Sequence, residues 1–146
     1  MRQITDTILM VRPSVFYANP ETSEDNAFQH VEDINLTQQA QAEFDALASA
    51  LARAGVKVCV VQDTPEPETP DALFPNNRIS FHTNGLAVLY PLRAPNRRLE
   101  HQLDVLRPLE AGDFFQPKHI LDYRSYVEEQ KFLEGTGSLV LDRVNR

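Results

Sequence analysis

The sequence is poor in cysteine, tryptophan, basic residues and long apolar runs. Its one cysteine, Cys59, excludes an intramolecular disulfide framework and favours a reducing, cytoplasmic compartment. The apolar runs are too short to cross a membrane, and the first residues lack the apolar core of a signal peptide. Lysine and arginine total 14 against 21 aspartate and glutamate, so the net charge of −7 argues against binding to nucleic acids or to anionic membranes.

What is present is the composition of a soluble globular protein. Of the 146 residues, 42% are hydrophobic and 24% are charged, which is enough for one domain with its own core. The segment 62–70 holds three prolines and three acidic residues, but strand patterns resume directly after it. We therefore interpret it as a surface connection and expect a single domain over residues 1–146.

The first half of the chain has a strand, a helix and a second strand. A short apolar run predicts a strand over 8–11, and a continuous β-branched run predicts a buried strand over 56–61. Between them, Thr37 is expected to cap a helix that Gly55 ends. The residues at helical spacing that we expect to face the core are Ala40, Phe44, Leu47, Ala48 and Leu51.

The second half begins with a hairpin. Strands are predicted over 79–82 and 86–90, joined at Asn84-Gly85. Asn96 is expected to cap a second amphipathic helix that Pro108 ends, with Leu99, Leu103 and Leu106 facing inward. Further strands are predicted over 119–121 and 138–141. Periodicity therefore predicts a mixed α/β fold with two strand–helix–strand units of related layout.

Two short polar runs could carry chemistry. In residues 70–77, Asp71, Asn76 and Asn77 would converge on one ligand if the chain folds back after Phe74. In residues 134–138, Glu134 precedes two glycines, which let the backbone approach a ligand closely. The alternatives are that the asparagines only form a turn, that Glu134 is a solvated residue before a glycine turn, and that Phe74 packs in the core.

These runs, together with Val11-Arg12-Pro13, resemble the guanidino-group-modifying enzymes. That superfamily includes arginine and agmatine deiminases, dimethylarginine hydrolases and amidinotransferases, and the likeness is greatest to the amidinotransferase and citrulline-utilisation hydrolase branch. The resemblance extends to the C-terminus. It implies a partial pentein-type α/β propeller, with about two of the five ββαβ units and the start of a third. Residues 1–146 would then be the N-terminal portion of one propeller domain.

The resemblance also implies a substrate-binding set and a substrate class. Carboxylates bind a planar, cationic guanidinium in bidentate fashion. In the family the first run ends with an acidic residue, whereas this chain has Asn77, an uncharged amide that suits a neutral ureido group. We expect a small guanidino or ureido amino acid such as arginine or citrulline. The substrate-binding residues implied are Asp71, Phe74, Asn76, Asn77 and Glu134.

No catalytic residue is assigned within this sequence. The family mechanism uses a cysteine nucleophile and a proton-transferring histidine, and the resemblance places both in a further half after Arg146. Cys59 lies in an apolar strand and is expected to be an inert core residue. The four histidines lack metal-ligand spacing, so neither a metal nor a cofactor is predicted.

Two functions are therefore expected. The first is the N-terminal part of an amidinotransferase-like C–N hydrolase, inactive alone, that associates with a C-terminal half or with itself. The alternative is a catalytically inactive remnant that binds a small molecule or oligomerises. Unpaired sheet edges and an uncovered interface would favour association in either case.

Three further features have two readings each. Arg97-Arg98 at the start of the second helix either contacts a carboxylate or lies on a solvated face. Arg78 stands where the branch usually has a tryptophan, which either alters a pocket wall or marks a diverged member. The polar loop that holds Asn19, Thr22, Asn26 and Gln29 is either a lid or scaffolding.

Overall fold

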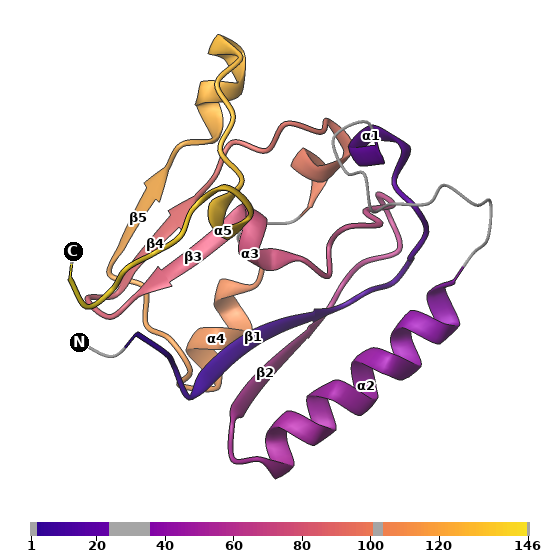
Figure 1. The fold of residues 1–146 in the computed structure, drawn as a ribbon, viewed down its shortest axis with the longest axis vertical. Coiled ribbons are helices and arrows are strands. Elements are labelled where there is room, and N and C mark those ends of the chain that lie inside the picture. Colours follow the sequence, from indigo (N-terminus) through magenta and orange to yellow (C-terminus); the bar gives the residue numbers. More distant parts are fainter. Residues whose placement is uncertain (1–2, 24–35, 101–103, 146) are drawn as a thin grey trace.

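The computed structural model describes residues 3–23, 36–100 and 104–145 and shows two small sheets joined by short helices (Figure 1). It confirms the expectation of a mixed α/β protein. Neither sheet closes into a barrel. No helix in the described part of the chain combines the length and apolar character needed to cross a bilayer.

The first sheet contains two parallel strands, β1 (Thr7–Arg12) and β2 (Lys57–Gln62). Their register runs from Thr7 opposite Lys57 to Arg12 opposite Gln62. The crossover between them contains the short helix α1 (Pro20–Ser23) and the long helix α2 (Thr37–Arg53), which lies along the sheet (Figure 1). Gly55 ends the helix with φ of +88°, a left-handed conformation that glycine adopts without strain.

The second sheet has the order β3-β4-β5. The predicted hairpin is confirmed: β3 (Ile79–His82) and β4 (Leu86–Leu89) are antiparallel and meet at Gly85, whose φ is +79°. Strand β5 (His119–Asp122) adds in parallel to β4. The connection from β4 to β5 contains η1 (Asn96–Leu99) and α4 (Leu106–Ala111), and η2 (Arg124–Glu129) follows β5.

Both sheets contribute to one hydrophobic core. Val11 and Cys59 come from the first sheet, Ile79 and Leu89 from the second, and Leu109 from α4. All five are less than 6% exposed. Because these side chains form a single cluster, the two sheets are held together by apolar burial rather than by backbone pairing between them.

Three predictions for the first sheet and its helix were wrong in detail. Leu36, not Thr37, is the N-cap of α2, because the Thr37 hydroxyl accepts a hydrogen bond from the Phe16 N–H at 2.8 Å. Leu47 is 53% exposed rather than inward-facing. In β2 only Cys59 is buried, and Val60 is 46% exposed, so the strand is not covered on both faces.

The predicted helix from Asn96 is also wrong. The chain forms only the short η1 there, Leu99 is 52% exposed, and the backbone of Glu100 leaves the helical region. Leu103 lies outside the described residues. Pro108 lies inside α4 rather than ending a helix, which is tolerated because it occupies the first turn, where a backbone N–H has no intrahelical partner. Leu106 is buried as predicted.

Two one-turn helices repeat each other locally. They are α3 (Pro75–Arg78) and α5 (Gly135–Ser138), sixty positions apart. Their N-cap residues have nearly the same backbone angles: φ −104° and ψ 63° at Phe74, and φ −102° and ψ 62° at Glu134. Each helix is followed by an extended residue. After α5, however, the predicted strand over 138–141 is wrong, since Ser138 is helical and 139–141 pairs with no described strand.

Candidate functional site

The two polar runs meet where α3 packs against α5 (Figure 1). The Asn76 Nδ2 donates to the Thr136 hydroxyl at 3.1 Å. A Cβ atom on Gly135 would lie 2.2 Å from the Asn76 carbonyl oxygen, and one on Gly137 would lie 2.4 Å from the Asn77 Nδ2. The glycines predicted to admit a ligand are therefore needed for the close approach of α3.

Three of the predicted site residues converge on a residue of the chain itself, Arg97. Its NH1 donates to Asn77 Oδ1 at 3.0 Å. The carboxylates of Asp71 and Glu134 lie 3.9 and 3.8 Å from its guanidinium nitrogens. Its NH2 contacts the carbonyl oxygens of Asp71 and Phe74, each at 3.4 Å. Asp71, Asn77 and Glu134, predicted to bind a substrate, thus surround a guanidinium group of the chain itself.

The Arg97 side chain is only 5% exposed, so it does not lie on a solvated helix face. Its Nε donates to Glu100 Oε1 at 2.8 Å, and the other oxygen of Glu100 accepts from Arg78 NH1 at 2.6 Å. Both partners of Glu100 are nine-tenths buried or more. The sequence interpretation missed Glu100; the signal was its position three residues after Arg97, a spacing that brings opposite charges together.

Arg78 is buried, and its guanidinium points away from solvent rather than forming a pocket wall. NH1 also donates to the Ala72 carbonyl oxygen at 3.2 Å. Its Nε is buried without a hydrogen-bond partner among the described residues. The residue therefore serves as the second counter-ion of Glu100.

Arg98, beside Arg97, has a different environment. Its guanidinium donates to the carbonyl oxygens of Leu92 and Arg93 and lies 5.6 Å from the centroid of the Phe132 ring. These contacts hold the segment around Phe132 against the loop after β4. The two neighbouring arginines thus have separate tasks, and only Arg97 belongs to the cluster of site residues.

The early loop contributes two of its four predicted residues. Asn19, fully buried, donates to Asp71 Oδ2 at 2.7 Å, and the Thr22 hydroxyl donates to the same oxygen at 3.3 Å. Asn19 and Asn96 also exchange amide hydrogen bonds. These bonds fix the carboxylate of Asp71, as scaffolding does. The other two loop residues, Asn26 and Gln29, lie outside the described part of the chain.

Glu134 is the more accessible of the two site carboxylates. Its side chain is 31% exposed, against 13% for Asp71. Its Oε1 accepts a hydrogen bond from the Arg93 N–H at 3.2 Å, so the side chain turns toward the loop after β4 instead of into bulk solvent. Among the described residues, the cluster of Asp71, Glu100, Glu134, Arg78 and Arg97 contains three carboxylates and two guanidinium groups, which leaves one formal negative charge.

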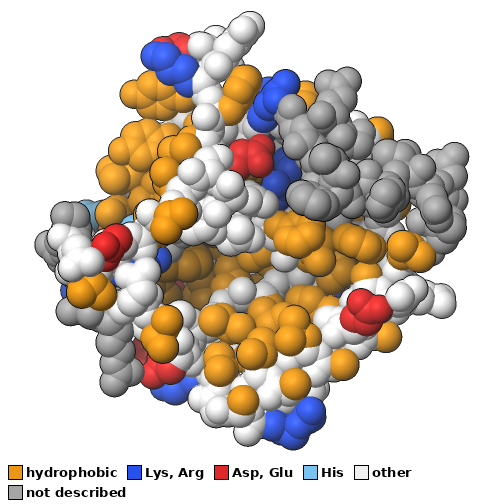
Figure 2. Space-filling model, viewed as in Figure 1, with side chains coloured by type: hydrophobic (Ala, Val, Ile, Leu, Met, Phe, Trp, Pro, Cys, Tyr) orange, Lys and Arg blue, Asp and Glu red, His pale blue; other side chains and the backbone are white. Residues whose placement is uncertain are grey.

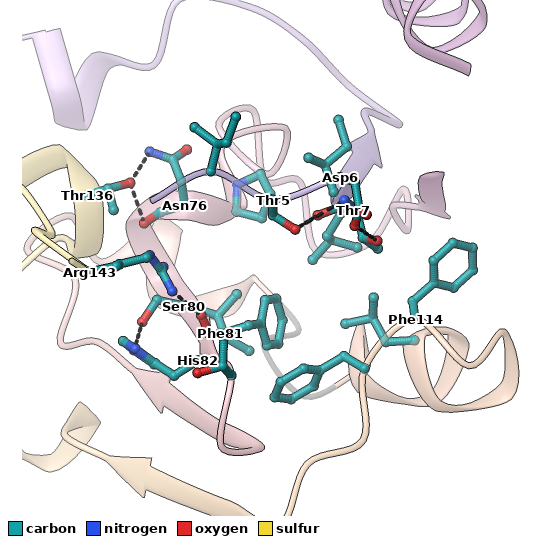
Figure 3. A pocket seen from close by; sticks show the side chains of 18 of the residues that line it. Thr5, Asp6, Thr7, Asn76, Ser80, Phe81, His82, Phe114, Thr136 and Arg143 are labelled. Carbon is teal, nitrogen blue, oxygen red and sulfur yellow. Dashed lines mark hydrogen bonds between the residues drawn. The ribbon is translucent and has the colours of Figure 1, made fainter. Parts of the chain in front are cut away.

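No contact is described between the charged groups of this cluster and the side chains of Phe74 and Asn76, although the Phe74 carbonyl oxygen reaches Arg97. Phe74 is 43% exposed and therefore does not pack in the core. Asn76 is exposed on the opposite side of α3, where it lines a groove of about 1130 Å³ together with Thr136 (Figure 3). The structure thus joins Asp71, Asn77 and Glu134 around one centre and leaves Asn76 on a second surface.

The groove is mainly apolar. Figure 2 shows a hollow with hydrophobic side chains on its floor, between β1 and the region of α3 and α5. The apolar lining residues include Ile8, Ile79, Phe81, Leu109, Phe114 and Phe115.

One end of the groove is polar. Ser80 Oγ lies 3.1 Å from His82 Nε2 and 2.8 Å from the Tyr90 hydroxyl. Arg143 donates to the carbonyl oxygen of Phe81 at 3.0 Å. Burial first, and the charge of Arg143 second, lower the pKa of His82 below its ordinary value. A neutral His82 therefore prevails at neutral pH.

Cys59 has none of the features of a nucleophile. It is 5% exposed within β2, and burial raises the pKa of its thiol. A thiol that resists ionisation is a poor nucleophile. Of the histidines, His119 lies exposed on β5, while His30 and His101 lie outside the described residues. Within the described ranges, no three His, Cys, Asp or Glu side chains gather as metal ligands would.

Comparison with known proteins identifies the family of the chain. A family model described as N,N dimethylarginine dimethylhydrolase, eukaryotic, matches residues 12–146. No curated protein and no solved structure matches significantly. The match covers nearly the whole sequence and agrees with the resemblance of the two polar runs. The chain therefore belongs to the N,N-dimethylarginine dimethylhydrolase family, within the superfamily of enzymes that modify guanidino groups.

Proposed function

We propose that residues 1–146 form the N-terminal portion of a pentein-type propeller domain that hydrolyses a C–N bond of a small guanidino or ureido amino acid. The observation that carries this proposal is the convergence of Asp71, Asn77 and Glu134 on one guanidinium group. These residues come from different parts of the sequence, and their chemistry is that of a guanidinium or ureido site. Family membership supports the same reaction class.

The charge of the cluster narrows the substrate. Its residual single negative charge lies nearest the surface at Glu134, which favours a ligand with a positive or hydrogen-bond-donating head group. Asn77 offers an uncharged amide where a fourth carboxylate would raise the negative charge of the cluster further. A ureido group, as in citrulline, presents a carbonyl oxygen that an amide N–H can contact. We therefore place citrulline beside arginine derivatives as a substrate.

The nucleophile is proposed to come from polypeptide outside residues 1–146. Cys59 is buried and its thiol pKa is raised, so it cannot supply the thiolate that the reaction requires. The apolar groove and the extended segment 139–141, with Val140 fully exposed, supply a surface for that polypeptide. A C-terminal half that packs there would supply the cysteine and the histidine.

A second candidate function is non-catalytic binding or oligomerisation. It is favoured by the same open groove and by the lack of a reactive thiol in this sequence. The two candidates differ in one measurable respect, because only the first predicts turnover when a C-terminal half is added.

The first test is calorimetric titration of the chain with L-arginine, L-citrulline and dimethyl-L-arginine. Asp71→Asn and Glu134→Gln should each weaken binding about tenfold, since each removes a charged hydrogen-bond partner. Asp45→Asn is the matched control, because Asp45 is an exposed carboxylate that pairs with Arg12 far from the site. Unchanged affinity in both site variants would contradict the proposed site.

The second test is turnover. The chain is mixed with a C-terminal half taken from an enzyme of this family, and release of ammonia from citrulline or of dimethylamine from dimethylarginine is followed. Product formation by the mixture, absent from either part, supports the hydrolase. A stable complex that releases neither product favours the binding function instead.

A further inference from the structure

We infer that Glu100 is a positioning residue that keeps the Arg97 guanidinium off the two site carboxylates, and that Arg78 holds Glu100 in place for this task. The inference goes beyond the proposed function. It rests on that function only in treating Asp71 and Glu134 as the groups that bind the substrate.

The side chain of Glu100 has no exposed surface. Each oxygen accepts one charge-assisted hydrogen bond, Oε1 from Arg97 Nε at 2.8 Å and Oε2 from Arg78 NH1 at 2.6 Å. With both oxygens bound by buried partners, the carboxylate cannot rotate or become hydrated. Glu100 is thus a fixed negative charge beneath the site.

The hydrogen bonds of Arg97 fix the orientation of its guanidinium group. A guanidinium group is planar, so a bond at Nε together with bonds at NH1 and NH2 determines both its position and its plane. The bond at Nε to Glu100 is the shortest that Arg97 makes in the described part of the chain. The carboxylates of Asp71 and Glu134 lie just outside hydrogen-bond distance, at 3.9 and 3.8 Å.

Removal of the Glu100 charge would release Arg97 from this position. Arg97 would then be attracted to the nearest remaining anions, Asp71 and Glu134, and a movement of about 1 Å would bring it into contact with them. It would neutralise the carboxylates that a cationic substrate needs. A neutral ureido ligand depends less on those charges, so loss of Glu100 should weaken arginine binding more than citrulline binding.

Arg78 holds Glu100 in place through its ion pair. Its buried Nε lacks a partner among the described residues, which is costly for a donor. Burial of this arginine is compensated by its ion pair with Glu100. Arg78 therefore acts on the substrate only indirectly, through Glu100, then Arg97, and then the two site carboxylates.

The decisive experiment observes Arg97 directly, without a ligand. In the ¹⁵N-labelled chain, the Arg97 Nε–H signal, assigned with Arg97→Lys, should be protected from exchange with water. Glu100→Gln, which keeps the side-chain volume, should abolish that protection. Asp45→Asn, the matched control, should change only Arg12. A protected Arg97 signal in Glu100→Gln would overturn the inference.

If Glu100→Gln does not fold, Glu100→Asp takes its place. It retains the charge but withdraws the carboxylate by one methylene group, so exchange of the Arg97 Nε–H should accelerate. Unchanged exchange in a folded Glu100→Asp protein would also overturn the inference.

Binding then tests the functional part. Glu100→Gln should raise the Kd for L-arginine about tenfold and that for L-citrulline by less than about threefold. In an Arg97→Met background, Glu100→Gln should leave the ratio of the two affinities unchanged, since Glu100 acts through Arg97. Equal losses for both ligands would refute the positioning role. If the wild type binds neither ligand, the proposed function fails, and the exchange measurement still decides the role of Glu100.

Discussion

The one-turn helices α3 and α5 have nearly the same backbone conformation at their ends but different roles. Both start from an N-cap residue in the same conformation and both lead into an extended residue. Helix α3 carries Asn76, Asn77 and Arg78, which reach Thr136, Arg97 and Glu100. Helix α5 carries glycine at two of its four positions, and its main contribution to the charge cluster is the N-cap residue Glu134.

The two helices therefore share a backbone conformation, but α3 supplies polar side chains and the glycines of α5 allow close packing. Helix α3 can approach this closely because Gly135 leaves room for its backbone and Gly137 leaves room for the Asn77 side chain. The strands that follow also differ: β3 is paired with β4, whereas 139–141 has no paired strand in the described chain. Equivalent positions of the two segments therefore make matched pairs for mutation.

The largest effect is expected at Gly135. Its φ is +41°, and a Cβ would lie 2.2 Å from the backbone oxygen of Asn76, which cannot move without shifting α3. Gly135→Ala should cost roughly 2–5 kcal/mol, the sum of left-handed strain and overpacking. Urea denaturation monitored by circular dichroism measures this loss.

Gly137→Ala is the matched control for that change. Its Cβ would meet the Asn77 Nδ2, the end of a side chain that can rotate away. Asn77→Ala should therefore rescue Gly137→Ala and fail to rescue Gly135→Ala. Equal rescue of both would show that side chains, not backbones, determine the approach of the two helices.

The next effect is expected at Arg78, whose counterpart in α5 is Ser138. Arg78→Ser removes one of the two arginines that pair with the buried Glu100 in the described part of the chain and should cost about 3 kcal/mol. Ser138→Ala removes one exposed hydrogen bond to the Glu134 N–H and should cost less than about 1 kcal/mol. Comparable denaturation midpoints for the two variants would contradict a structural role for the Arg78–Glu100 pair.

A smaller effect separates the two extended segments. Ser80→Ala removes a hydroxyl that bonds the buried Tyr90 hydroxyl and should cost about 1–2 kcal/mol. Its counterpart Val140 is fully exposed, and Val140→Thr should change stability by less than about 0.5 kcal/mol. A large loss in Val140→Thr, measured by thermal unfolding, would reveal that this segment is covered in solution.

The smallest effect is in the pH dependence of His82 and its counterpart Asp142. The pKa of His82 is lowered by burial and by Arg143, so the unfolded chain binds its proton more readily. Its contribution to stability is therefore full above about pH 6.5 and falls as pH drops through the folded-state pKa. His82→Asn should flatten the unfolding free energy between pH 7.5 and 5.5.

Asp142 should act in a separate pH window. Hydrogen bonds from Asn145 and then Val144 lower the pKa of its carboxyl, so its contribution is present above about pH 4 and is lost below it. Asp142→Asn should leave the pH dependence of the unfolding free energy above pH 5 unchanged. If it altered the same range as His82→Asn, the two groups would have to be coupled.

Local patterns in the sequence predicted much of the secondary structure and the chemistry of the site. Alternation and turn chemistry predicted the hairpin at Gly85, and an apolar run predicted β1. The helix expected from Asn96 ends after one turn, since the backbone of Glu100 leaves the helical region where its side chain joins the buried ion pairs. Family-like runs predicted Asp71, Asn77 and Glu134 as substrate-binding residues, and the structure brings these three together around Arg97.

The sequence by itself determined the α/β class, the family and which side chains suit a guanidinium or ureido group, because these depend on residue type and short-range spacing. Only the tertiary structure decided that Arg97 lies among those side chains and that Glu100 and Arg78 hold it there. Buried ion pairs form between residues that many chain conformations keep apart, so no local pattern specifies them. The same holds for α3 and α5, whose packing becomes visible only when both one-turn helices are placed in space.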